Sequence, residues 1–165
     1  MMKVVFLAAA TLAAQVALGL PSSPPWMAAV LLPVVFITAP PLLQSERRWP
    51  HFALLLGLAW DLMLEPVVGP GAIAWSAAAV VISLVVPLVA DRSPRAWLAF
   101  GALGAALVIV VREVALLPLG MTGGLSWRSA AVSVSLTAGW CCLIGWIIAL
   151  DLPSRWLRYR SRKLR

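Results

Sequence analysis

Charged side chains are scarce in this sequence. Only 12% of its 165 residues are charged, six of them are acidic, and there is a single histidine. A soluble domain carries about a quarter charged residues, and so few polar groups cannot cover a core built from a chain that is 62% apolar. Together with a mean hydropathy of +0.97, the composition predicts an integral membrane protein.

The sequence also lacks the usual patterns of catalytic and metal-binding sites. Its only histidine, His51, follows Pro50 in a predicted loop, and no HExxH, GxSxG or P-loop pattern occurs. The two cysteines, Cys141 and Cys142, are adjacent within an apolar run, which fits neither a CxxC metal site nor a disulfide framework. We therefore expect no enzymatic activity, no metal, no cofactor and packed, unreactive thiols.

Basic residues give a net charge of +7, yet their distribution does not point to nucleic acid. They lie in short clusters between apolar runs and do not alternate with aromatic residues. Eleven of the thirteen fall on one side of the predicted topology, with Arg128 opposite and Arg112 inside a helix. Because cytoplasmic loops carry the excess of Lys and Arg, both termini are predicted to be cytoplasmic.

Six apolar runs predict the fold class, an all-α polytopic bundle of six transmembrane helices. Most approach the length of about 20 residues that crosses about 30 Å of hydrocarbon, but the third reaches only about 20 Å. We expect one transmembrane domain at residues 1–150, with the first run kept as a helix and not cleaved as a signal peptide. The six runs are 4–20, 26–43, 52–64, 72–90, 96–119 and 130–150.

Residues 151–165 form a basic tail that mixes cations with Trp156 and Tyr159. This mixture is typical of a segment that lies on an anionic leaflet, where each base contributes about 1 kcal/mol. We therefore expect anionic phospholipids as a partner. The six bases are Arg155, Arg158, Arg160, Arg162, Lys163 and Arg165.

Four charged residues lie within or at the end of apolar runs: Asp61, Glu65, Arg112 and Glu113. Each charge inside a membrane helix costs about 2.5–3.5 kcal/mol on insertion scales, so these groups require partners or water. The rise per residue places Arg112 nearer in depth to Glu65 than to Asp61. Glu65 is therefore the expected partner of Arg112.

Asp61 is predicted to lie near the middle of the bilayer, and its partner stays open at this stage. The hydroxyl groups of Thr11 and Ser83 lie at similar predicted depths, and a neutral, protonated carboxyl is the other option. Gly57 lies on the same helix face as Asp61 and Glu65, which predicts a closely packed interior face. Such acids mark either an ion relay or a buried structural network, and the small number of acids favours the structural network.

Two short segments carry a resemblance to a known family. Residues 57–62, Gly-Leu-Ala-Trp-Asp-Leu, and residues 69–72, Gly-Pro-Gly-Ala, are similar to the Gly-Leu-x-x-Asp-Leu segment and the following glycine of the MreD family of bacterial rod shape-determining membrane proteins. This similarity adds Gly69 and Gly71 to the candidate site residues. The chain also resembles that family in size and layout along nearly its whole length.

The last apolar run adds to the resemblance. Trp-Arg-Ser at 127–129 leads into a run with Trp140 and then the basic tail, as in that family. Members often carry an asparagine in this helix, whereas this chain contains no asparagine. Ser133, Ser135 and Thr137 are the candidates for the same polar role.

The resemblance implies a non-enzymatic scaffold subunit of the elongasome, the machinery that builds the lateral peptidoglycan wall and sets cell shape. The expected location is the bacterial cytoplasmic membrane. The expected partner is MreC, a single-span protein, beside the RodA polymerase, its class B penicillin-binding transpeptidase and MreB filaments.

The alternative is a substrate-binding subunit of an energy-coupling-factor vitamin transporter, also a small six-helix protein. The alanine pairs Ala9/Ala13 and Ala10/Ala14 fit the Ala-x-x-x-Ala pattern of its first helix. Such a protein needs several polar groups that converge on a pocket near the outer face. The predicted outer loops are short and poor in polar groups, which favours the scaffold.

Overall fold

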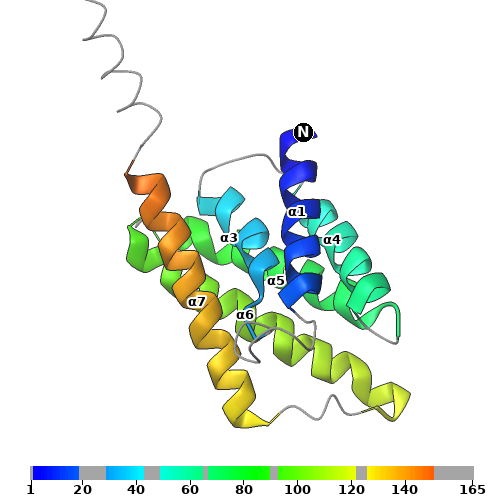
Figure 1. Ribbon diagram of the computed structural model, residues 1–165. Helices are drawn as coiled ribbons and strands as arrows, with labels where there is room; N and C mark the ends of the chain where they lie inside the picture. The colour runs from blue at the N-terminus through cyan, green and yellow to red at the C-terminus, as the bar shows by residue number, and fades with distance from the viewer. Residues whose placement is uncertain are drawn as a thin grey trace, which may run out of the picture.

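Every element in the described part of the chain is helical, as the computed structural model shows (Figure 1). The described residues are 2–18, 29–42, 49–64, 67–89, 93–121 and 126–150. The all-α prediction is therefore confirmed for these residues. The elements are α1 (Met2–Leu18), η1 (Leu32–Val34), α3 (Val35–Leu42), α4 (Trp49–Leu64), α5 (Pro70–Val85), η2 (Val86–Leu88), α6 (Pro94–Leu116), η3 (Leu117–Leu119) and α7 (Trp127–Ala149).

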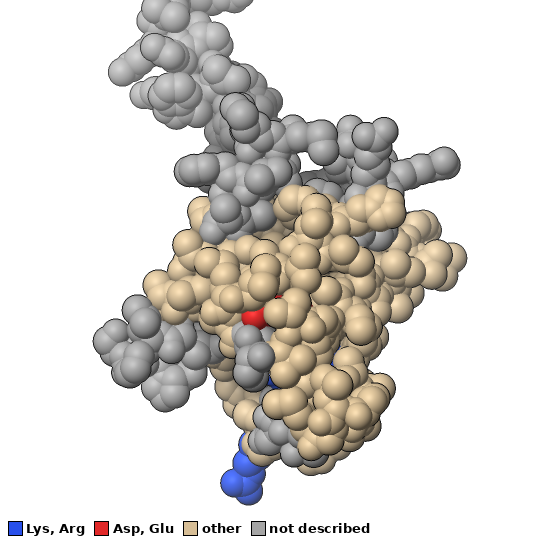
Figure 2. Space-filling view, turned by 90° about the vertical axis from the view of Figure 1, so that its right-hand side faces the viewer, with Lys and Arg blue, Asp and Glu red and all other residues tan. Residues whose placement is uncertain are grey.

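Three of the described helical segments are long and apolar enough to cross a bilayer, as expected for a membrane protein: Pro70–Leu88, Arg95–Leu119 and Trp127–Ala149. Helix α4 is apolar but shorter, with 16 residues that span about 24 Å. It begins three residues before the predicted third run. In Figure 2 one side of the molecule is almost free of charge across its described residues, as a lipid-facing surface requires.

The apolar run at 26–43, predicted as one of the six transmembrane helices, is not helical throughout its described part. Residues 29–31 are not helical, and only the turn η1 and the eight-residue α3 follow. Pro33 lies in the first turn of η1, where its fixed φ and missing N–H suit the start of a helix but not its interior. The apolar run is therefore long enough to cross a membrane, but its backbone is interrupted.

Helices α4, α5, α6 and α7 pack as successive neighbours, with the most extensive contacts between α6 and α7. Helix α3 lies against α5 and α6, while α1 contacts η1 and α4 (Figure 1). Gly101, Ala105 and Val108 share one face of α6 and are all buried. Its outer end is Arg112, which is half-buried.

Two glycines allow α6 and α7 to approach closely. An ideal Cβ on Gly101 would lie 2.6 Å from the Cβ of Cys141, which is itself buried and has a free thiol. An ideal Cβ on Gly145 would overlap the side chain of Trp97, including its Cβ at 2.8 Å. Since the Cβ of Trp97 moves only with its backbone, this end of the α6–α7 pair admits no larger residue.

We predict that Gly145→Ala lowers the thermal stability of the detergent-purified protein. Overpacking of a tight contact costs about 1–3 kcal/mol, which exceeds the gain of up to about 1 kcal/mol in helix propensity. The matched control is Gly139→Ala on the same helix, where an added Cβ meets no atom within 4 Å. Equal melting temperatures for the two variants would show that the contact with Trp97 is not limiting.

Candidate functional site

The carboxyl group of Asp61 is completely buried, with 0% of the residue exposed, and it lies at the start of α5. Its Oδ2 accepts hydrogen bonds from the backbone N–H of Gly69 at 2.7 Å and of Ala72 at 3.2 Å. The N–H of Gly71 donates to both oxygens, at 3.0 Å to Oδ1 and 3.1 Å to Oδ2. Asp61 on α4 therefore caps the N-terminus of the next helix.

This cap satisfies the whole first turn of α5. A helix leaves its first N–H groups without partners inside the helix. Pro70 has no N–H to satisfy, and the N–H of Ile73 donates to the carbonyl oxygen of Gly69 at 3.0 Å. The remaining N–H groups at 69–72 all donate to Asp61. The positive end of the helix dipole also favours an acidic group at this place.

Three glycines make this arrangement possible. Gly69 has a φ of +127°, which L side chains rarely adopt. A Cβ on Gly71 would collide with Oδ1 of Asp61, and a Cβ on Gly57 would lie 2.7 Å from both the Cα of Ala72 and the carbonyl oxygen of Gly71. The structure thus brings four of the candidate residues, Gly57, Asp61, Gly69 and Gly71, into one site.

The partner of Asp61 differs from both expected ones. The donors are backbone amides, not the hydroxyl group of Thr11 or Ser83. The Ser83 hydroxyl instead donates to the carbonyl oxygen of Val80 in its own helix at 2.7 Å. Both carboxyl oxygens of Asp61 accept hydrogen bonds, which matches a ring of backbone N–H donors. The geometry is that of a structural cap.

A second contact joins α4 and α5 beside the cap. The rings of Trp60 and Trp75 pack with centroids 5.5 Å apart and planes tilted by 48°, and both residues are buried. Aromatic pairs in such tilted arrangements add about 0.5–1.5 kcal/mol beyond their buried area. The two rings border a small cavity of about 130 Å³, which is also lined by Leu31, Val108, Ile109, Arg112 and Ser133.

Arg112 and Glu113 are adjacent on α6 and form an ion pair, with 3.5 Å between Nη1 and Oε1. Their side chains are 25% and 28% exposed. The sequence argument did not pair these neighbours. Glu65, the expected partner of Arg112, lies outside the described residues, so that contact stays a prediction, and the six bases of the tail also lie outside them.

Polar side chains of α1 and α7 hold the non-helical segment 29–31. The N–H of Leu31 donates to Oγ1 of Thr137 at 3.0 Å, and the N–H of Leu32 donates to Oε1 of Gln15 at 3.0 Å. The hydroxyl group of Ser133 donates to the carbonyl oxygen of Ala29. Backbone groups outside a helix need partners of another kind, and these side chains supply them.

Two of the three polar candidates on the last helix make these contacts. Ser133 and Thr137 bind the backbone of 29–31, whereas Ser135 is exposed and makes no such contact. The contribution of Gln15 was missed, although a lone glutamine that is 4% exposed inside an apolar run is the kind of signal that marks such a contact.

Within the part of the chain that the structure describes, no three His, Cys, Asp or Glu side chains come together in a way that can hold a metal ion. Comparison of the chain with protein-family models, curated proteins and solved structures found no match.

We predict that Asp61→Ala strongly destabilises the protein. It leaves the N–H groups of Gly69, Gly71 and Ala72 without acceptors, and each buried unsatisfied group costs about 1–3 kcal/mol. Asp61→Asn keeps one acceptor oxygen and should fall between Ala and the wild type. Thermal unfolding in detergent is the measurement, with Ser83→Ala as the control for losing a polar group inside a helix. If the melting temperature of Asp61→Ala equals that of Ser83→Ala, the cap is not a stabilising element.

We also predict that Thr137→Val destabilises the protein by about 1–3 kcal/mol, because it removes the acceptor for the N–H of Leu31 while keeping the side-chain shape. Ser135→Ala, two residues earlier on the same helix, should leave the unfolding midpoint unchanged. The two midpoints are measured in the same detergent, and a Ser135→Ala loss as large as that of Thr137→Val contradicts the assignment.

Proposed function

We propose that this protein is a non-enzymatic membrane scaffold of the MreD type, which docks MreC within the rod-shape machinery of the bacterial cytoplasmic membrane. In this proposal the chain crosses the membrane six times, with both termini in the cytoplasm. RodA, its transpeptidase and MreB are neighbours in the same assembly, and the basic tail binds anionic phospholipids.

The observation that supports the proposal most is that Asp61 joins α4 to α5, because both of its carboxyl oxygens accept hydrogen bonds from amides at the start of α5. The segment with the most specific family resemblance, 57–72, is the segment that forms this joint. Its acid accepts from the backbone and is fully buried, so it presents no reactive group to a substrate or ion. A rigid joint whose Asp61 is fully buried suits a protein whose role is to hold another protein's membrane helix.

Two cavities lined by described residues both weigh against the transporter alternative. Pockets that bind small molecules occupy about 300–1,000 Å³ and contain a few convergent polar groups. The cavity beside Arg112 and Ser133 measures about 130 Å³, which is too small for a vitamin. A larger groove of about 650 Å³ between α6 and α7 has an almost entirely apolar lining. The small cavity with polar groups and the large apolar groove are thus separate sites.

Six crossings are compatible with the described helices. The three long segments are long and apolar enough to cross a bilayer. Helices α1 and α4 have 17 and 16 residues, a few short of the length of a full crossing. In the interrupted second run, η1 and α3 follow a non-helical segment whose polar groups are held by Gln15, Ser133 and Thr137. Such backbone is tolerated at membrane depth where protein surrounds it.

Co-purification tests the proposal. MreC co-expressed with the tagged protein should be recovered with it after extraction in a mild detergent, because helix–helix contacts in lipid persist when backbones approach closely. An unrelated single-span membrane protein of similar expression level is the control and should remain in the flow-through. Absence of MreC, together with a rise in melting temperature on adding a vitamin, would establish the transporter reading instead.

A further inference from the structure

A small cavity of about 130 Å³ lies where four helices and the interrupted segment meet. Trp60 and Trp75 bring the α4–α5 joint to this space, and Leu31 belongs to the non-helical segment 29–31. Ser133 comes from α7, and α6 supplies the rest of the lining: Val108, Ile109 and Arg112. The lining therefore combines apolar side chains with a guanidinium group of α6 and a hydroxyl group of α7.

The hydrogen-bonding capacities of Arg112 and Ser133 are complementary. The guanidinium group of Arg112 carries five N–H donors and no acceptor. The O–H of Ser133 donates to the carbonyl oxygen of Ala29, so the lone pairs of its Oγ act toward the cavity as acceptors. A molecule that both accepts and donates can therefore bridge the two groups, and water is the smallest such molecule.

The ion pair between Arg112 and Glu113 is compatible with such a bridge. A bidentate carboxylate accepts from two N–H groups, whereas a guanidinium group has five. Arg112 also lies inside Arg95–Leu119, which is long and apolar enough to cross a bilayer. Charged side chains in such segments pair with one another or face a water-filled cavity. Arg112 is paired and also lines a cavity.

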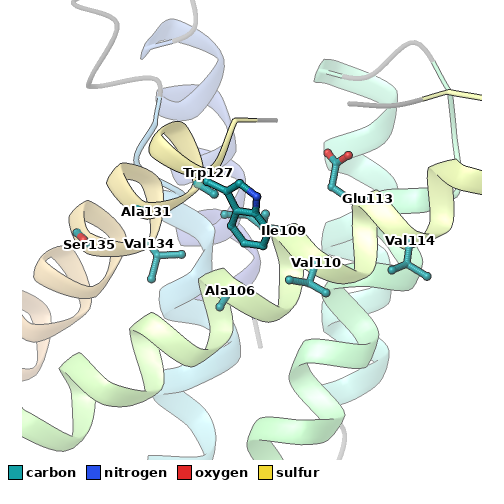
Figure 3. Close-up of a pocket in the computed structure, with 10 residues that line it drawn as sticks. Ala106, Ile109, Val110, Glu113, Val114, Trp127, Ala131, Val134 and Ser135 are labelled. Carbon is teal, nitrogen blue, oxygen red and sulfur yellow. The ribbon is translucent and has the colours of Figure 1, made fainter. Parts of the chain in front are cut away.

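Another side of α6 has a different character (Figure 3). The large groove between α6 and α7 is lined there mainly by apolar side chains, such as Ala106, Val110 and Val114. Figure 3 shows these two valines on a different side of the helix from the Glu113 carboxyl group. Ile109 borders both spaces. Helix α6 thus separates an apolar groove from the cavity that its guanidinium group lines.

The size of the cavity fits water. A water molecule occupies about 30 Å³ in the liquid, so a cavity of about 130 Å³ has room for about four. Sites for drug-sized ligands begin at about 300 Å³. Cavities that stay dry have an apolar lining, whereas this lining includes Arg112 and Ser133. Both the volume and the chemistry of the lining therefore favour water.

We propose that this cavity binds a cluster of about four water molecules, one of which accepts a hydrogen bond from Arg112 and donates one to Oγ of Ser133. The cluster solvates the guanidinium group within the bundle. It also links α6 to the side chain that holds the interrupted backbone at Ala29. The inference goes beyond the scaffold function and does not depend on it.

A small anion fits the cavity less well. Chloride accepts from Arg112 but has no proton to donate to Oγ of Ser133, whose own O–H is used by Ala29. The carboxylate of Glu113, with 3.5 Å between its Oε1 and Nη1 of Arg112, also offsets the positive charge that would hold an anion. Water is uncharged and both donates and accepts, so it meets neither difficulty.

Hydroxyl-radical footprinting tests the inference, because radicals formed from bound water by brief X-ray irradiation oxidise the side chains beside it. The purified protein is irradiated in lipid nanodiscs, and the oxidation of each tryptophan is quantified by tandem mass spectrometry. Trp75 lines the cavity and is 1% exposed. The matched control is Trp97, which is 3% exposed and does not line the cavity. We expect Trp75 to be oxidised faster than Trp97.

Variants of Arg112 connect the water to its donor. Arg112→Leu removes every N–H donor of the side chain and should lower the oxidation rate of Trp75 to that of Trp97. Arg112→Gln keeps an amide that both donates and accepts, so Trp75 should still be oxidised faster than Trp97. Melting temperatures show whether each variant is folded, and the comparison of the two tryptophans in the wild type stands without the variants.

Three outcomes would overturn the proposal. Equal oxidation of Trp75 and Trp97 in the wild type means that the cavity holds no water. Unchanged oxidation of Trp75 in a folded Arg112→Leu variant means that Arg112 does not hold the water. A melting temperature that falls when gluconate replaces chloride at constant ionic strength means that the occupant is a small anion. None of these measurements involves MreC, so their failure is distinct from failure of the proposed function.

Discussion

The contact between the Asp61 carboxylate and the first amides of α5 is the constraint on which the rest of the bundle depends. It supplies a fully buried acceptor to the first N–H groups of α5, which have no partner inside their own helix. Gly57 and Gly71 bring the two helices close enough for the contact. Because α5 then packs on α6, and α6 on α7, the position of this one helix start sets the placement of the three long segments.

Part of this site is predictable from the sequence. The four-residue spacing of Gly57 and Asp61 predicts a shared interior face, and both residues are buried. The donors are not predictable in the same way, since backbone amides at a helix start have no residue type of their own. The predicted depths of polar side chains therefore point to Thr11 and Ser83 instead. Gly69 and Gly71 are the residues that indicate such a contact in the sequence. A glycine has no Cβ and adopts conformations that other residues rarely adopt, so the backbone at these positions can approach a carboxyl group closely.

The helical class and the three long segments follow from hydropathy, because about 20 apolar residues have few other uses. Hydropathy does not reveal an interruption such as 29–31, whose residues are as apolar as those of a continuous helix. Pro33 marks the place only when its effect on the preceding turn is considered. The compensating groups, Gln15, Ser133 and Thr137, come from helices distant in sequence, so local patterns cannot pair them. Glu65 and Arg112 are likewise far apart in the sequence, so local patterns cannot pair them. That ion pair stays a prediction.

The support of residues 29–31 by α7 also has a consequence for biogenesis. The Asp61 cap joins residues 8–11 positions apart, so it can form as soon as the α4–α5 hairpin has left the ribosome. The bond from Leu31 to Thr137 spans 106 positions, and that from Ser133 to Ala29 spans 104. The N–H of Leu31 and the carbonyl oxygen of Ala29 therefore lack these partners until the last helix has been added. A truncated chain without α7 leaves both backbone groups without these hydrogen bonds.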